Sequence, residues 1–257
     1  METENTKRDM NMNENTHTTT DEKAGRLPVY NLIILDKSGS MASVRKETVD
    51  AYNETLGTIK AAQKKYPDTQ EHFVSLAAFC SCGIEMIYDK VPALEAEIMS
   101  YDRYQPCCCT PLFDAIGSTM SKLRAHAEKG GDYSALVTII TDGYENDSKE
   151  WTGESVKALI EACRKEGWMV SFIGAMEDAE RVAMSISITN VIHWEQTHEG
   201  TAAMSRLHSS KTTRFMNRLN DNIMHCLNAD HMMSIDERKN SRQDFSDDFY
   251  GDDDQKQ

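Results

Sequence analysis

The sequence lacks long apolar runs. Nowhere in its 257 residues do the roughly 18 consecutive apolar residues that a membrane-spanning helix needs occur. The first residues, METENTKRDMNMNENTHTTTDEK, are polar throughout and contain none of the apolar core of a secretory signal. Both absences lead us to expect an unexported, cytoplasmic protein without a membrane partner.

Basic residues are too few to suggest a nucleic-acid partner. The chain has 28 Lys and Arg against 42 Asp and Glu, which gives a formal net charge of −14. Phosphate binding needs clustered Lys and Arg, so this balance argues against nucleic acid and against an anionic membrane surface. An acidic protein can still bind a carboxylate, provided that a local cation lies between the two.

The cysteine pattern is not that of a disulfide framework. Seven cysteines are an odd number, and Cys107, Cys108 and Cys109 are consecutive. Adjacent cysteines do not easily bridge each other, and a chain of this length needs no disulfides, which favours a reducing compartment. The paired C-x-x-C spacing of common zinc sites is also absent. We therefore interpret Cys80, Cys82 and the 107–109 run as small residues rather than as zinc ligands.

Several enzyme motifs are missing as well. Neither G-x-G-x-x-G nor G-x-x-x-x-G-K-[ST] follows the first apolar run, and no G-x-S-x-G or H-E-x-x-H is found. A phosphotransferase with an aspartyl nucleophile would need a second acid two residues after Asp36, where Ser38 stands. Catalysis is therefore the weaker hypothesis.

Apolar runs alternate with segments of helical spacing. The runs predict strands at Val29–Asp36, His72–Phe79, Ile84–Val91, Ala135–Thr141, Trp168–Gly174 and Asn190–Trp194. Helices are expected from about Ser43, from Pro111 to about Glu128, at Glu154–Glu166 and Asp178–Ser187, and between Thr201 and Leu227. This alternation predicts a doubly wound (Rossmann-like) α/β three-layer sandwich, with helices on both faces of a mostly parallel sheet. The short turn at Cys80–Gly83 predicts one antiparallel edge strand.

Polar segments flank this core. Residues 1–26 are rich in Asn, Thr, Glu and Asp, and residues 229–257 end in the acidic run DFSDDFYGDDDQKQ. Neither segment offers enough apolar surface to bury, so both are expected to be disordered. A single domain is expected over 27–228.

Two predicted strands end in an aspartate, Asp36 and Asp142. In doubly wound sheets, ligands bind beyond the carboxyl ends of the strands, where the strand order reverses. Asp36 opens D-K-S-G-S, so that Ser38 and Ser40 add hydroxyls to its carboxylate, as a hard divalent ion requires. Taken singly, these residues and Thr110 also fit turns and helix caps.

The order of these motifs resembles that of a known family. D-K-S-G-S-M at 36–41, T-P-L at 110–112 and T-D-G at 141–143 resemble the metal-ion-dependent adhesion site (MIDAS) of the von Willebrand factor A (vWA) family, in its bacterial intracellular type. The resemblance covers nearly all of 27–228. It implies Mg²⁺, or Mn²⁺ or Ca²⁺ in its place, held by Asp36, Ser38, Ser40, Thr110 and Asp142.

The resemblance also implies a function. Such an ion docks an acidic residue, Glu or Asp, of a protein partner, so a metal-dependent binding module is expected rather than an enzyme. The alternatives are a metal-assisted phosphoesterase that uses the same aspartates, and a vWA scaffold that has lost its metal. The cysteines at 107–109 depart from the small residues that often precede the Thr in relatives. Asp114, one helical turn after Thr110, is expected either to face the ion as an indirect acceptor or to be a solvated carboxylate at the helix start.

Overall fold

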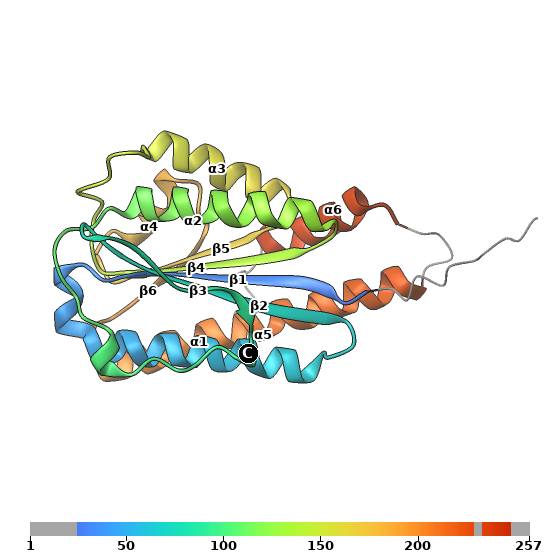
Figure 1. Cartoon of the computed structure of the whole chain (residues 1–257), viewed down its shortest axis with the longest axis horizontal. Coiled ribbons are helices and arrows are strands. Elements are labelled where there is room, and N and C mark those ends of the chain that lie inside the picture. The colour runs from blue at the N-terminus through green and yellow to red at the C-terminus, as the bar shows by residue number, and fades with distance from the viewer. Residues whose placement is uncertain (1–24, 229–232, 248–257) are drawn as a thin grey trace, which may run out of the picture.

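A six-stranded sheet forms the centre of the molecule (Figure 1). The computed structural model describes residues 25–228 and 233–247. In chain order the strands are β1 (Leu27–Asp36), β2 (Gln70–Cys80), β3 (Gly83–Pro92), β4 (Ser134–Thr141), β5 (Met169–Gly174) and β6 (Asn190–His193). Their order across the sheet is β3-β2-β1-β4-β5-β6, and only β3 is antiparallel to its neighbour. The predicted fold class is therefore confirmed.

The strands that carry the candidate site lie next to each other. β1 and β4 are nearly continuous apolar runs buried along their length, because helices cover both faces of the sheet. They pair in parallel, with Leu35 opposite Ile140, so Asp36 and Thr141 end their strands side by side. Since the chain leaves β1 towards β2 and later returns on the other side as β4, the strand order reverses between these two ends.

Helices cover the two faces of the sheet (Figure 1). One face is covered by α1 (Arg45–Lys65) and α5 (His198–Asn228), and the other by α2 (Leu112–Ala127), α3 (Gly153–Lys165) and the short α4 (Ala179–Ser185). The apolar face of each helix packs on the sheet, for example Tyr52 and Leu56 of α1 and Ile116 and Met120 of α2. None of the helices in the described ranges combines the length and the apolar character needed to cross a bilayer.

β3 is an irregular edge strand. Its pairing with β2 shifts register between Val74 and Ala77, which marks a bulge. Within the bulge Lys90 has a positive φ of 55°, and its backbone N–H donates to the Ser75 hydroxyl at 3.0 Å. The regular pairing of backbone groups between β2 and β3 is consequently interrupted at this point.

The C-terminal segment differs from its expected disorder. Within 229–257, Ile235–Asp247 forms helix α6, which packs against α5 and α3. Ser234 caps it, since its hydroxyl accepts from the Glu237 N–H at 3.2 Å. The guanidinium of Arg242 is buried against the Asp132 carboxylate, so a charged segment is ordered by a carboxylate far away in the sequence. Residues 1–24, 229–232 and 248–257, where disorder was also expected, lie outside the described residues.

Candidate metal centre

The first candidate ligands lie in the loop that follows β1. Asp36 is buried, and its Oδ1 accepts from the backbone N–H of Ser38 at 2.6 Å. This bond turns the chain immediately after the strand and leads into the 3₁₀ turn Gly39–Val44. The hydroxyls of Ser38 and Ser40 lie 3.3 Å apart, with Ser38 buried and Ser40 exposed.

The end of β4 completes the cluster from the neighbouring strand. The Ser40 hydroxyl donates to Oδ1 of Asp142 at 2.6 Å, across 102 residues of sequence. Thr141, the last residue of β4, donates its hydroxyl to Oδ2 of Asp36, also at 2.6 Å. Gln196 donates to the other Asp142 oxygen at 3.3 Å. Ser38 and Ser40 thus connect the two aspartates, while Thr141 holds Asp36 and Gln196 holds Asp142.

Thr110 approaches the same point from the loop before α2. Its backbone N–H donates to the Asn146 side chain at 2.8 Å, and its carbonyl accepts from the Asn146 N–H at 3.1 Å. A methyl group placed on Gly143 would lie 2.9 Å from the Thr110 hydroxyl and 3.5 Å from Oδ2 of Asp36. Both oxygens therefore lie around Gly143, where only a glycine leaves them room.

Two separations between these oxygens are close to those around a small divalent ion. Oxygen ligands of octahedral Mg²⁺ lie about 2.1 Å from the metal, so neighbouring ligands are about 3.0 Å apart. The separations of 3.3 Å between Ser38 and Ser40, and of 2.6 Å between Ser40 and Asp142, fall on either side of that value. Two carboxylates and three hydroxyls are also the hard donors that Mg²⁺, Mn²⁺ and Ca²⁺ prefer.

The site carries uncompensated negative charge. Burial raises the pKa of Asp36 to about 6, the Asp142 charge adds to this, and hydrogen bonds from Thr141 and Ser38 oppose it. Burial likewise raises the pKa of Asp142, against hydrogen bonds from Ser40 and Gln196. Hydrogen bonds, rather than neighbouring basic side chains, are the main effects that lower the pKa of the two aspartates. A bound cation would supply the missing positive charge.

Comparisons with known proteins establish the fold. No family model and no curated relative matches the chain. Among solved structures, a von Willebrand factor type A protein from Catenulispora acidiphila is 16% identical, with a TM-score of 0.50 over 73% of this chain and 43% of that one. Proximal thread matrix protein 1 (PTMP1) from the mussel byssus, solved with a zinc-occupied MIDAS, is 14% identical, with a TM-score of 0.51 over 75% of this chain and 48% of that one.

A third match is a single domain. The SpRpn10 VWA domain is 9% identical, with a TM-score of 0.50, and the match covers 69% of this chain and 93% of that domain. The chain has the fold of a von Willebrand factor A domain. It spans less than half of the first two solved proteins, so their other parts have no counterpart in the match.

On this vWA scaffold the five residues predicted as ligands come together. Asp36, Ser38, Ser40 and Asp142 form one hydrogen-bonded set, and Thr110 lies beside it at Gly143. The simpler interpretation of Thr110 as a helix cap does not hold. Pro111 occupies the N-cap position of α2 with a non-helical ψ of 67°, and no side chain caps the helix there.

Asp114 matches neither of its two expected roles. Its carboxylate accepts the backbone N–H groups of Lys149, Glu150 and Trp151 at 2.8, 2.9 and 2.7 Å. Burial would raise the pKa of Asp114, but these three hydrogen bonds outweigh it and lower the pKa. Asp114 therefore positions the segment after Asp142 instead of facing the ion.

Other contributors to the site were not apparent from the sequence. Thr141 and Gln196 orient the two aspartates, Asn146 holds the backbone of Thr110, and the Tyr104 hydroxyl donates to the Asp36 carbonyl. Of these only Thr141, which precedes Asp142 in the T-D-G motif, had a signal in the sequence. The rest come from loops whose path depends on the tertiary fold.

Proposed function

We propose that this chain is a divalent-metal-dependent protein-binding module. Asp36, Ser38, Ser40, Thr110 and Asp142 would hold one ion, and the ion would bind a Glu or Asp of a partner protein. The observation that carries this proposal is the convergence of two carboxylates and three hydroxyls at the carboxyl ends of β1 and β4.

The donor set supports Mg²⁺ as the resident ion, with Mn²⁺ or Ca²⁺ as substitutes. Three of the five proposed ligands are hydroxyls, which contribute no formal charge. A divalent ion held by such a set retains affinity for one further carboxylate. The net charge of −14 makes the ion necessary, because an acidic surface otherwise repels an acidic partner.

The surroundings of the site suggest how a partner would be recognised. Tyr144 follows Asp142 by two residues, and its side chain is 48% exposed. Its hydroxyl donates to Asp178 at 2.5 Å, which restricts the orientation of the ring. Exposed, oriented aromatic side chains are frequent anchors in protein interfaces. We expect Tyr144→Ala to weaken binding of the partner while leaving binding of the metal unchanged.

Calorimetric titration with Mg²⁺ and Mn²⁺ tests the metal-binding step. The wild type should bind one ion, whereas Asp36→Ala and Asp142→Ala should lose binding and remain folded by circular dichroism. Asp68→Ala, which removes an exposed carboxylate at the opposite end of the sheet, is the control. Absence of heat and of any thermal shift in the wild type would support the alternative of a vWA scaffold without metal.

A pull-down tests the partner step. Wild-type protein and Asp142→Ala are compared as baits, each with and without EDTA. A partner captured only by the wild type, and only without the chelator, is the expected result.

The enzymatic alternative makes a different prediction. In the described part of the chain, the hydroxyls of Ser38 and Ser40 hydrogen-bond to each other and that of Ser40 also to Asp142. No histidine is among these partners, so neither serine has an adjacent base of the usual kind. Turnover of a generic phosphoester with Mg²⁺ that disappears in Asp36→Ala would establish a metal-assisted phosphoesterase. We expect no such turnover.

We also propose a cytoplasmic location. Support comes from the cysteine pattern, in which an odd number of thiols includes three consecutive ones. Measuring the thiol content of the protein isolated from its source cells checks this, since a reducing compartment leaves all seven cysteines free of disulfides.

A further inference from the structure

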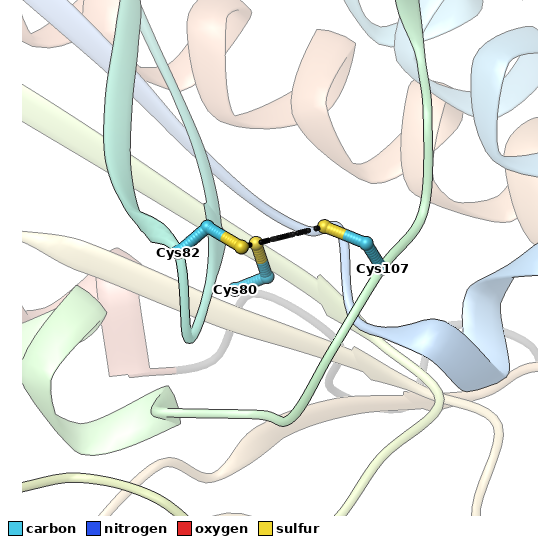
Figure 2. A group of neighbouring side chains, drawn as sticks. All are labelled: Cys80, Cys82 and Cys107. Atoms are coloured by element: carbon cyan, nitrogen blue, oxygen red, sulfur yellow. Dashed lines mark hydrogen bonds between the residues drawn. The ribbon is translucent and has the colours of Figure 1, made fainter.

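Four of the seven cysteines meet beside the loop that leads to Thr110. Cys80 ends β2, Cys82 lies in the turn before β3, and Cys107 and Cys108 precede α2. The Sγ atoms are 3.4 Å apart for Cys80 and Cys107, 3.9 Å for Cys82 and Cys107, and 3.3 Å for Cys82 and Cys108. Figure 2 shows the sulfurs of the first three turned towards one another from the hairpin and the facing loop.

These separations are close to those of a tetrahedral thiolate site. A zinc ion binds each sulfur at about 2.3 Å, which places neighbouring sulfurs about 3.8 Å apart. The three separations lie between 3.3 and 3.9 Å, and the sulfurs of Cys80, Cys82 and Cys107 all lie within 4.8 Å of one another. The Cys108 sulfur contacts Cys82 but lies outside this group of three, so it must turn towards Cys80 and Cys107 to complete a tetrahedron around one ion.

The backbone fixes the two cysteine segments against each other. The Ser81 N–H donates to the Cys109 carbonyl at 3.1 Å, and the Cys109 N–H donates to the Ser81 hydroxyl at 3.0 Å. On the other side, the Cys107 N–H donates to the Lys37 carbonyl at 2.8 Å. Cys108 has a positive φ of 62°, a left-handed conformation that is unfavourable for a non-glycine residue. The chain thus holds the thiols together in a strained loop.

Burial does not explain this grouping. Cys163 is a fully buried core residue, as free cysteines often are, whereas Cys82 and Cys108 are exposed. Exposed thiols gain nothing from packing, and their clustering at metal-ligand distance therefore indicates a ligand.

We propose that Cys80, Cys82, Cys107 and Cys108 bind one Zn²⁺ as a structural four-thiolate site. Four Zn–S bonds form, the four thiol protons pass to solvent, and no electrons are transferred. The ion would tie the β2–β3 turn to the loop before Thr110. This loop also contacts the first MIDAS segment, since the Gly39 N–H donates to the Cys108 carbonyl at 2.9 Å.

The thiolate site is chemically distinct from the oxygen site next to it. Four soft thiolates select zinc, while carboxylates and hydroxyls select Mg²⁺, Mn²⁺ or Ca²⁺. The zinc proposal therefore does not depend on the proposed protein-binding function, and either one can fail alone.

The first experiment measures the metal content of the full chain, purified in a reductant without added metal. Elemental analysis should find about one zinc per chain that survives dialysis against a weak chelator, as expected for a closed structural site. Replacing zinc with Co²⁺ should produce the intense d–d bands of a tetrahedral ion and a sulfur-to-metal charge-transfer band. Asp36→Ala should keep both features, because it alters only the oxygen site.

Variants then assign the ligands. Cys82→Ser and Cys108→Ser change exposed side chains and should each reduce the zinc content to below about one-fifth and abolish the charge-transfer band. Cys109→Ser and Cys163→Ser, whose sulfurs are not among the close contacts, should retain both. Circular dichroism of each variant establishes that it is folded.

Three results would overturn the proposal. The first is a wild type without stoichiometric zinc and without cobalt bands. The second is zinc that remains in Cys82→Ser but is lost in Asp36→Ala, because the ion would then occupy the oxygen site. The third is a reductant-purified wild type whose mass is four hydrogens below that of the seven-thiol chain, because the thiols would then be paired as disulfides.

Discussion

At the candidate metal centre both carboxylates are oriented by neighbouring residues. Asp36 is held through one carboxylate oxygen by the Ser38 backbone and through the other by the Thr141 hydroxyl. Asp142 is held in the same way by Ser40 and Gln196. Binding groups that are oriented before the ligand arrives lose less conformational entropy, which favours affinity.

Gly143 provides a test of the Thr110 position. In Gly143→Ala the new methyl group would lie 2.9 Å from the Thr110 hydroxyl, so the hydroxyl must move away from the cluster. We expect Mg²⁺ binding to weaken about tenfold, which corresponds to about 1.4 kcal/mol. Calorimetry gives the affinity. The control is Gly57→Ala, whose methyl group meets no atom within 4 Å and whose affinity should be unchanged.

The buried Asp36 predicts a pH-dependent stability in the absence of metal. Its folded pKa of about 6 exceeds the ordinary 3.8, so the charged form destabilises the fold. That cost is absent below pH 3.8, grows between pH 3.8 and 6, and is fully present above pH 6. In EDTA, Asp36→Asn should therefore raise the free energy of unfolding by about 1 to 3 kcal/mol at pH 8, and by little at pH 4. Equal effects at both pH values in urea denaturation would contradict this.

At the scale of elements, α2 is anchored to the segment that follows Asp142. Its first N–H groups have partners there: the Phe113 N–H donates to Glu145 at 2.9 Å, and the Asp114 N–H donates to the Ser148 hydroxyl at 3.0 Å. The Asp114 carboxylate in turn accepts three N–H groups of residues 149–151. The helix start and the loop thus satisfy each other's backbone groups, which keeps Thr110 next to Asp142.

Asp114→Ala would remove three of these bonds at once. The free energy of unfolding should fall by about 2 to 3 kcal/mol at pH 7, because three N–H groups lose an ionised acceptor. Since the pKa of Asp114 is lowered, this contribution is present above pH 3.8 and disappears as pH falls below it. Chemical denaturation at several pH values measures the effect. Glu150→Ala, which changes an exposed neighbour, should have almost no effect.

At the scale of the whole molecule, α6 lies at the end of the sheet opposite to the metal centre (Figure 1). Arg238 and Arg242 both pair with Asp132, two residues before β4, and the Lys239 ammonium lies 4.9 Å from the centre of the Tyr133 ring. The Arg242 side chain is only 1% exposed. The helix is thus held by charge at one end of the sheet while the ligands gather at the other.

Asp132→Ala should lower the stability of the fold without changing metal binding. It removes the carboxylate that compensates a buried guanidinium, and we expect a loss of about 3 kcal/mol in the free energy of unfolding. Mg²⁺ affinity should be unchanged, because the metal centre lies across the sheet. Thermal denaturation and calorimetry on the same sample report both quantities. Asp68→Ala, an exposed acid at the same end as Asp132, should change neither.

The sequence predicted the sheet well because its central strands are buried on both faces. The runs that became β1, β4 and β5 are almost entirely apolar, and such patterns depend little on tertiary detail. The candidate ligands were also recognisable, since Asp36 and Asp142 directly follow two of these runs and the hydroxyls of Ser38 and Ser40 lie two and four residues further on.

Features that depend on contacts between distant segments escaped prediction. Helix α6 is highly charged and has a weak apolar face, and it is ordered by Asp132, more than a hundred residues away. The sulfurs of Cys80 and Cys107 meet only because the loop before α2 crosses the β2–β3 turn. No spacing rule along the chain reports such a crossing.

The bulge in β3 has a consequence for how partners can attach. An unpaired strand edge can recruit a strand from another chain, which leads to sheet extension or aggregation. The row of backbone donors and acceptors along β3 is interrupted by the positive φ at Lys90 and by the terminal Pro92. The charges of Glu85 and Asp89 further disfavour pairing with another strand. Strand addition along this edge of the sheet is therefore disfavoured, which leaves β6 as the less protected of the two edge strands in the described sheet.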